Sequence, residues 1–121
     1  SGSAYIFVRD ALNNWSQEFK FVVSDGAAAG DQFGYSVGIY GNTAIVGAWG
    51  DDENGGNSGS AYVFKRDASN NWSEQPQLLA NDGEAGDRFG TSVGIYSNTM
   101  VVGAFRDDDN GVNSGSAYVF S

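Results

Sequence analysis

Carboxylates supply most of the reactive side chains in this chain, because its 121 residues contain neither histidine nor cysteine. The chain therefore has no imidazole base, no thiolate nucleophile and none of the usual zinc ligands. Its most acidic segments are the runs Asp51-Asp52-Glu53-Asn54-Gly55 and Asp107-Asp108-Asp109-Asn110-Gly111. Closely spaced oxygen ligands before a glycine are typical of a calcium loop.

The two acidic runs match a calcium loop only in part, because such a loop has oxygen ligands at positions 1, 3 and 5 and glycine at position 6. With Gly111 at the glycine position, Asn110 and Asp108 fill two ligand positions, but Arg106 stands at the first. In the other run Gly50 stands there. A solvated turn is favoured over a weak Ca²⁺ site. The ligands of such a site would be Asp51, Asp52, Glu53, Asp107, Asp108 and Asp109.

Catalysis is not expected from these carboxylates. An enzyme without histidine or cysteine would need paired carboxylates acting on a glycosidic bond. The aspartates here lie instead in glycine-rich loops that recur along the chain, whereas an active site is usually a unique constellation. The sequence therefore favours a protein that is not an enzyme.

The net charge of −9, from 15 acidic and 6 basic residues, narrows the range of partners. A surface this negative repels phosphate backbones and anionic headgroups. No apolar run approaches the roughly 18 residues that span a bilayer. Nucleic acid and membrane insertion are therefore not expected.

The strongest signal in the sequence is an internal repeat. The segment Ser1-Gly2-Ser3-Ala4-Tyr5-Ile6-Phe7 returns, with one change, at residues 58–64 and 114–120. Asn13-Asn14-Trp15-Ser16 returns at residues 70–73, and Gly30-Asp31-Gln32-Phe33-Gly34 returns, again with one change, at residues 86–90. The first and second copies of the opening segment are 57 residues apart, and the second and third are 56 apart. A difference of one residue is best placed in a loop.

Each period predicts four short strands, because β-branched and aromatic residues cluster between Gly, Asn and Asp. The expected strands are Phe33–Tyr40, Thr43–Trp49, Ser60–Lys65 and about Trp72–Ala80. Pro76 marks the last of them as an edge strand. Along the first strand, one face carries Phe33, Tyr35, Val37 and Ile39, and the other carries only Gly34, Ser36 and Gly38. The bare face suits close stacking between neighbouring units.

Tandem four-stranded units of this length predict an all-β protein made of β-propeller blades, each an antiparallel meander. A β-solenoid and a duplicated sandwich are the alternatives. Residues 1–29 would form the last two strands of a first blade, 30–85 a complete blade, and 86–121 the first three strands of a further blade. About two blades per chain do not close a ring of roughly 4 to 8. Other copies of the chain, or sequence outside this segment, would complete it as a ring or filament.

Several spaced motifs identify the repeat more closely. Phe33-Gly34, Val46-Gly47-Ala48 and Gly59 to Phe64 recur in the same order as Phe89-Gly90, Val102-Gly103-Ala104 and Gly115 to Phe120. Together they resemble the FG-GAP repeat of integrin α-subunit propellers, in the version found in large exported bacterial proteins. The resemblance implies a structural role for Phe33, Gly34, Gly47, Phe89, Gly90 and Gly103. It also implies an extracellular or cell-surface setting and a role in binding, adhesion or scaffolding.

The chain departs from the integrin pattern at two places. Trp49 and Phe105 stand where the family has the proline of Gly-Ala-Pro. The family's calcium loop between the first two strands of a blade is also missing, because only residues 40–43 and 96–99 connect those strands here. The family's calcium ligands therefore have no counterparts in this sequence. We take Ser1, which is not a methionine, to indicate a processed, excised or engineered segment.

The expected meander places the second-to-third and fourth-to-first connections on one side of the molecule. That side would carry 11 of the 15 carboxylates, partly offset by Arg88 and Arg106. Such a face favours cations or cationic partners, and in integrin-like propellers the corresponding side engages ligands. A protein or glycan ligand is expected there, with the acidic runs joined by Asp25, Asp31, Asp82, Glu84 and Asp87.

Two repeated tryptophans leave alternatives open. Trp15 and Trp72 could stack on sugars, as in a lectin-like propeller, but packing between blades is the favoured role. Both belong to Asn-Trp-Ser segments that match the glycosylation acceptor pattern. A second alternative is a purely structural repeat, natural or engineered, that associates with copies of itself.

Overall fold

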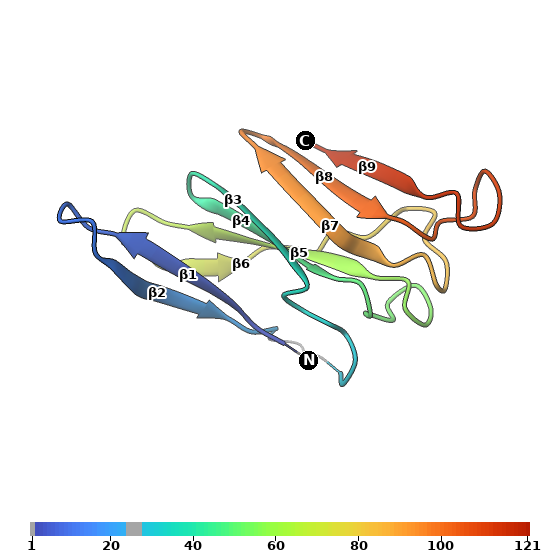
Figure 1. Cartoon of the computed structure of the whole chain (residues 1–121), viewed down its shortest axis with the longest axis horizontal. Coiled ribbons are helices and arrows are strands. Elements are labelled where there is room, and N and C mark those ends of the chain that lie inside the picture. Colours follow the sequence, from blue (N-terminus) through green and yellow to red (C-terminus); the bar gives the residue numbers. More distant parts are fainter. Residues whose placement is uncertain (1, 24–27) are drawn as a thin grey trace.

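The computed structural model describes residues 2–23 and 28–121, and within them every regular element is a β-strand (Figure 1). No helix in these two ranges is long and apolar enough to cross a membrane. The strands are β1 (Ala4–Arg9), β2 (Trp15–Phe21), β3 (Ser36–Tyr40), β4 (Thr43–Ala48), β5 (Ser60–Arg66), β6 (Trp72–Glu74), β7 (Phe89–Tyr96), β8 (Thr99–Ala104) and β9 (Ser116–Phe120).

The strands form three antiparallel sheets in which each strand pairs with the next along the chain. We call β1–β2 the first blade, β3–β6 the middle blade and β7–β9 the third blade. The expected all-β meander of propeller blades is confirmed. Short turns join strands at one end of the molecule, and the longer loops lie at the other end (Figure 1).

Two strands of the middle blade are shorter than the sequence predicts. β3 begins at Ser36 and not at Phe33, because its pairing with β4 starts at Ser36, opposite Gly47. β6 ends at Glu74, since Pro76 has no N–H to donate. Leu78 then exchanges both hydrogen bonds with Ala61, at 2.7 and 3.0 Å.

The other limits differ by a residue from those expected, with β4 ending at Ala48 and β5 reaching Arg66. In the first blade the strand that corresponds to β6 is unbroken from Trp15 to Phe21, because Phe19 takes the place of the proline. The pairing register shifts between Ile6 and Phe7 in the first blade and between Phe89 and Ser92 in the third.

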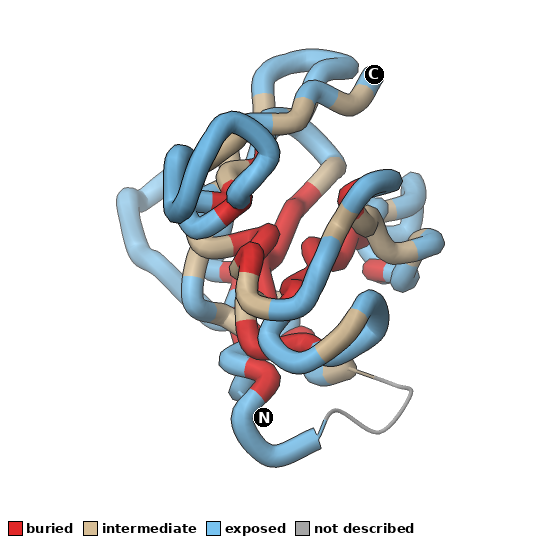
Figure 2. The backbone as a smooth tube through the Cα atoms, turned by 90° about the vertical axis from the view of Figure 1, so that its right-hand side faces the viewer, coloured by how far each residue is buried: buried red, intermediate tan, exposed pale blue. Residues whose placement is uncertain are grey.

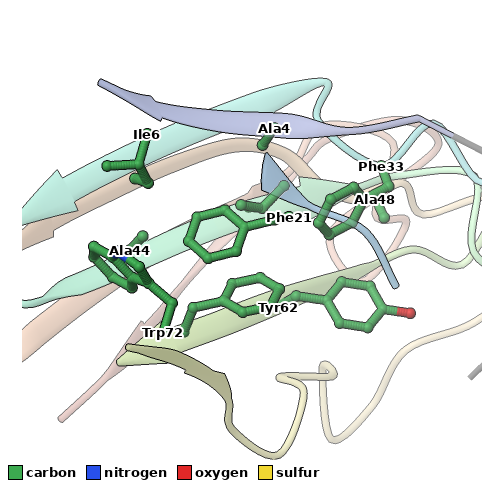
Figure 3. Close-up of a cluster of buried hydrophobic side chains, with 10 residues drawn as sticks. Ala4, Ile6, Phe21, Phe33, Ala44, Ala48, Tyr62 and Trp72 are labelled. Carbon is green, nitrogen blue, oxygen red and sulfur yellow. The ribbon is translucent and has the colours of Figure 1, made fainter. Parts of the chain in front are cut away.

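The apolar core consists of two layers, one on each side of the middle blade. Buried stretches gather between the blades, with exposed backbone around them (Figure 2). In the layer against the first blade, Phe21 stacks on Phe64 at 4.1 Å and meets Trp72 edge-on at 5.4 Å (Figure 3). In the layer against the third blade, Ile45 packs with Phe89 and Val102. Each blade therefore buries its side chains against its neighbour.

The two repeated tryptophans differ in burial. Trp72 is 7% exposed, and its indole N–H donates to Glu18 of the first blade at 2.9 Å, so this residue packs between the two blades. Arg66 forms an ion pair with the same carboxylate at 3.0 Å. Trp15 occupies the equivalent place in the first blade and is 66% exposed, because no described residue covers that face.

Glycines allow main chain to pack directly on main chain where blades meet. A Cβ atom on Gly47 would overlap the carbonyl oxygen of Gly90 and the hydroxyl of Ser36, and one on Gly34 would overlap the carbonyl of Ser3. The bare face expected on the first strand of the repeat is therefore used for close stacking. The opposite face, with Val37 and Ile39, lines an apolar groove of about 160 Å³ beside β1.

Replacing Gly47 with alanine is expected to lower the free energy of unfolding by about 1–3 kcal/mol, the usual effect of overpacking. Gly94→Ala is the matched control, because a Cβ atom at that strand position meets no atom within 4 Å. Urea denaturation followed by tryptophan fluorescence compares the two variants. Equal denaturation midpoints would show that the blades do not need this close approach.

Candidate functional site

Four connections meet at one end of the molecule, which we call the loop end; their described residues are 22–23 with 28–35, 49–59, 75–88 and 105–115. The same-side placement expected from the meander is therefore found (Figure 1). Main-chain hydrogen bonds link the loops of adjacent blades, as from Gly86 N–H to the carbonyl of Gly56 at 2.9 Å, and from Arg88 N–H to that of Asn57 at 3.1 Å. The loop end is thus a continuous surface.

Four aspartates of the loop end are buried: Asp31, Asp51, Asp87 and Asp107. Asp51 accepts hydrogen bonds from the hydroxyls of Ser60 and Tyr62 at 2.6 and 2.8 Å. In the next repeat Asp107 accepts one from the hydroxyl of Tyr118 at 2.7 Å and another from the main-chain N–H of Asp109 at 2.9 Å. These carboxylates anchor the β4–β5 and β8–β9 loops to the sheets.

Asp31 and Asp87 do the same for the other two loops. Each carboxylate accepts the main-chain N–H three residues earlier, from Ala28 at 2.6 Å and from Glu84 at 2.8 Å. Their main-chain carbonyls also accept from Gly50 and Arg106, at 3.0 and 3.3 Å, so they connect the loops to one another. The buried aspartates therefore have a structural role.

One tyrosine joins two of these carboxylates. The hydroxyl of Tyr118 lies 2.7 Å from Asp107 and 2.8 Å from Asp82, and it donates to one of them at a time. Burial, followed by these two hydrogen bonds, raises the pKa of Tyr118 above its ordinary value. The pKa of Asp107 is lowered, first by the N–H of Asp109 and then by Tyr118, because both donors stabilise the carboxylate.

Six other carboxylates of the loop end are exposed, and we call them the acidic rim: Asp52, Glu53, Asp82, Glu84, Asp108 and Asp109. The pKa of Asp109 is raised, first by a hydrogen bond with Asp82 and then by the negative charges of Asp107 and Asp82. Like charges are thus held close together on this surface. Among the predicted ligand-binding residues, Asp82 and Glu84 are exposed, Asp31 and Asp87 are buried, and Asp25 lies outside the described residues.

The predicted cation ligands are not brought together. Within residues 2–23 and 28–121, no group of three or more acidic side chains is placed to hold a metal ion. Oxygens of Asp52 and Asp108 accept main-chain N–H groups from Asn57 and Asn113, which closes their own turns. The weak Ca²⁺ site stays a prediction, and this arrangement gives it no support.

Sequence reasoning missed two features of the loop end. The tyrosine partners of Asp51 and Asp107 were not predicted, although a tyrosine follows each aspartate after eleven residues. A cluster of Trp49, Phe105 and Arg88 was also missed. Arg88 lies 4.4 Å from the ring centre of Trp49 and 5.8 Å from that of Phe105. The signal available was that these positions differ between the two repeats although the residue before each is identical, Asp31 and Asp87 in one case and Ala48 and Ala104 in the other.

A comparison with protein families supports this architecture. A family model described as the FG-GAP repeat matches residues 15–64 and 72–120, which together make up most of the chain. A search of curated proteins gives no match.

The repulsion at Asp109 predicts a pH-dependent stability. A raised pKa in the folded state favours the protonated carboxyl, so its stabilising contribution is present below the ordinary pKa of aspartate and is lost as the pH rises through the folded value. Asp109→Asn is therefore expected to raise stability at pH 7 and to have a smaller effect at pH 3. Thermal denaturation at both pH values and at low salt measures this difference.

Glu53→Gln is the control for this experiment, because Glu53 holds the equivalent position in the other repeat and carries the same charge. It should reproduce only the general effect of removing one negative charge. If the two variants changed stability equally at both pH values, the interaction of Asp109 with Asp82 would have no role in it.

Proposed function

Because this chain belongs to the FG-GAP repeat family, we propose that it is a non-catalytic binding or scaffold module of an extracellular or cell-surface protein. FG-GAP repeats in general form propeller blades that serve as binding modules, and they are typical of extracellular or surface proteins. The two matched repeats account for most of the chain. This match supports binding as the function of the module.

The acidic rim is the observation that carries the choice of partner. Its six carboxylates lie on loops that the buried aspartates hold in place, so little loop ordering would be needed on binding. A surface of one charge also steers the approach of partners of the opposite charge. The partner that fits best is a cationic segment of a protein, rich in lysine or arginine.

Binding of an arginine- and lysine-rich peptide tests this proposal. The double variant Glu53→Gln/Asp109→Asn is expected to weaken binding about threefold or more. Added salt should weaken binding to the parent chain, because salt shortens the distance over which exposed charges interact, which is about 8 Å at physiological salt. Fluorescence anisotropy with a labelled peptide gives both quantities.

The matched control is Asp10→Asn/Asp67→Asn, which removes two charges at the opposite end of the blades. In both residues an amide oxygen can still accept the hydrogen bonds of the turn. The control should bind the peptide nearly as well as the parent chain. Equal weakening in the two double variants would indicate attraction by net charge alone and would count against the rim as a site.

Self-association is a second candidate function, and the exposure of equivalent residues favours it. Val119 on the outer face of the third blade is 67% exposed, whereas Val63, its equivalent in the middle blade, is 5% exposed. The outer face of the first blade behaves alike, with Tyr5, Phe7 and Trp15 exposed where Tyr62, Phe64 and Trp72 are buried. A second copy of the chain could therefore place its first blade on the third blade, using the contact already present between neighbouring blades.

Light scattering over a range of concentrations tests self-association. The chain is expected to exceed its monomer mass of 12.7 kDa, and Val119→Lys should return it to the monomer because it places a charge in the contact. Val112→Lys is the control, since Val112 lies in the β8–β9 loop and not on the strand face. A parent chain that stays monomeric at every concentration would rule this function out.

A further inference from the structure

A half-open hollow of about 190 Å³ lies at the loop end between the middle and third blades. Its walls are Tyr35, Trp49, Arg88, Thr91 and Phe105. Tyr35 and Arg88 lie shortly before the inner strands β3 and β7, and Trp49 and Phe105 follow directly after β4 and β8. The hollow is therefore formed by strand ends, which the sheets hold in place.

Aromatic rings hold the guanidinium group of Arg88. Its central carbon lies 4.4 Å from the ring centre of Trp49 and 5.8 Å from that of Phe105. Tyr35 meets Trp49 edge-on at 5.9 Å, and Arg106 lies 5.5 Å from the ring of Phe105. A guanidinium that stacks on aromatic faces keeps the N–H groups along its edge directed away from the rings.

Those N–H groups have no protein acceptor among the residues that the structure describes. The ion pair found among the described residues joins Arg66 to Glu18, and neither residue lines the hollow. As a donor, Arg88 uses its main-chain N–H alone, which donates to the carbonyl of Asn57. The carboxylate of adjacent Asp87 is buried and accepts from Glu84. In a chain with 15 acidic residues, this fork of donors is left for a ligand or solvent.

The fold does not require an arginine at this position. Gln32 holds the equivalent place in the preceding repeat, and the two residues share nearly the same backbone, with φ angles of 61° and 60°. The neighbouring Gly-Asp and Phe-Gly pairs are identical in both repeats, whereas Tyr35 is replaced by Thr91 and Trp49 by Phe105. The hollow thus combines residues that occur together at one junction only of the described chain.

We propose that this hollow binds an acidic sugar, with the carboxylate of a uronic acid on Arg88 and the pyranose ring against Tyr35 or Phe105. An arginine fork matches a carboxylate with two parallel hydrogen bonds. The exposed aromatic faces accommodate the apolar face of a sugar ring. The hydroxyl of Thr91 donates to the carbonyl of Arg88 at 2.6 Å, so its oxygen remains free to accept from a sugar hydroxyl.

Size and charge narrow the ligand further. The hollow is smaller than the roughly 300 Å³ at which drug-sized pockets begin, so it suits one terminal sugar ring. The acidic rim would repel a long polyanion, whereas a single carboxylate in the hollow meets the guanidinium group of Arg88. The site therefore selects a single acidic sugar at the end of a glycan.

Two small ligands that differ only in the carboxylate test the proposal on the whole chain. Methyl β-glucuronide and methyl β-glucoside are titrated into labelled protein and followed by NMR. The glucuronide is expected to bind saturably, with shifts at Tyr35, the indole of Trp49 and Thr91. The glucoside should bind about tenfold more weakly, the effect of losing a charge-assisted hydrogen bond pair.

Arg88→Gln is the decisive variant, because the preceding repeat shows that glutamine fits this backbone. It should remove the preference for the glucuronide. Arg9→Gln is the matched control, since Arg9 also stacks on a tryptophan, 5.8 Å from the ring of Trp15, but lies outside the hollow. The control should bind like the parent chain.

Three results would overturn the site: no binding of the glucuronide at tens of millimolar, equal binding of the two glycosides, or an unchanged preference in Arg88→Gln. The proposal is independent of the cationic partner of the acidic rim. Glu53→Gln/Asp109→Asn should leave glucuronide binding in place, and Arg88→Gln should leave the peptide bound. Failure of one proposal is therefore distinguishable from failure of the other.

Discussion

The structure depends on the fact that a blade has two apolar faces and no core of its own. A blade must therefore bury both faces against neighbouring blades. The middle blade does so, with aromatic side chains buried against the first blade and aliphatic ones against the third. Glycines such as Gly47 bring main chain against main chain at the junction with the third blade. Shape and spacing of the blades thus follow from the backbone, and this leaves the loops free to carry different side chains.

The loop end divides its carboxylates between two tasks. Buried Asp51 and Asp107 receive hydroxyl donors from the sheet, and buried Asp31 and Asp87 receive N–H donors from their own loops. Because each buried charge is satisfied by hydrogen bonds, its desolvation is offset and the loops are held in position. The remaining carboxylates face solvent, where they determine the charge that a partner meets.

Much of the fold could be predicted from the sequence, because the repeat reveals strand order, turn positions and the glycines of the junctions. The ends of the strands could be predicted less well: β3 pairs with β4 only from Ser36, and β6 ends before Pro76, although the composition of both segments still favours extension. For the loop end, composition could not separate buried from exposed aspartates, since the same residue type serves both. Contacts such as Arg88 with Trp49 join residues far apart in sequence, so only the folded chain brings them together.

Pro76 also has a consequence for strand pairing at the edge of the middle blade. The outer edge of the middle blade is the short strand β6, and a proline next to it interrupts the row of N–H donors that an extended chain would need for pairing. The edge of the third blade is β9, whose residues Ser116–Phe120 pair on one side with β8. Aggregation through added strands should therefore begin at an edge that lacks a proline, such as β9 or the unbroken β2, and not at β6.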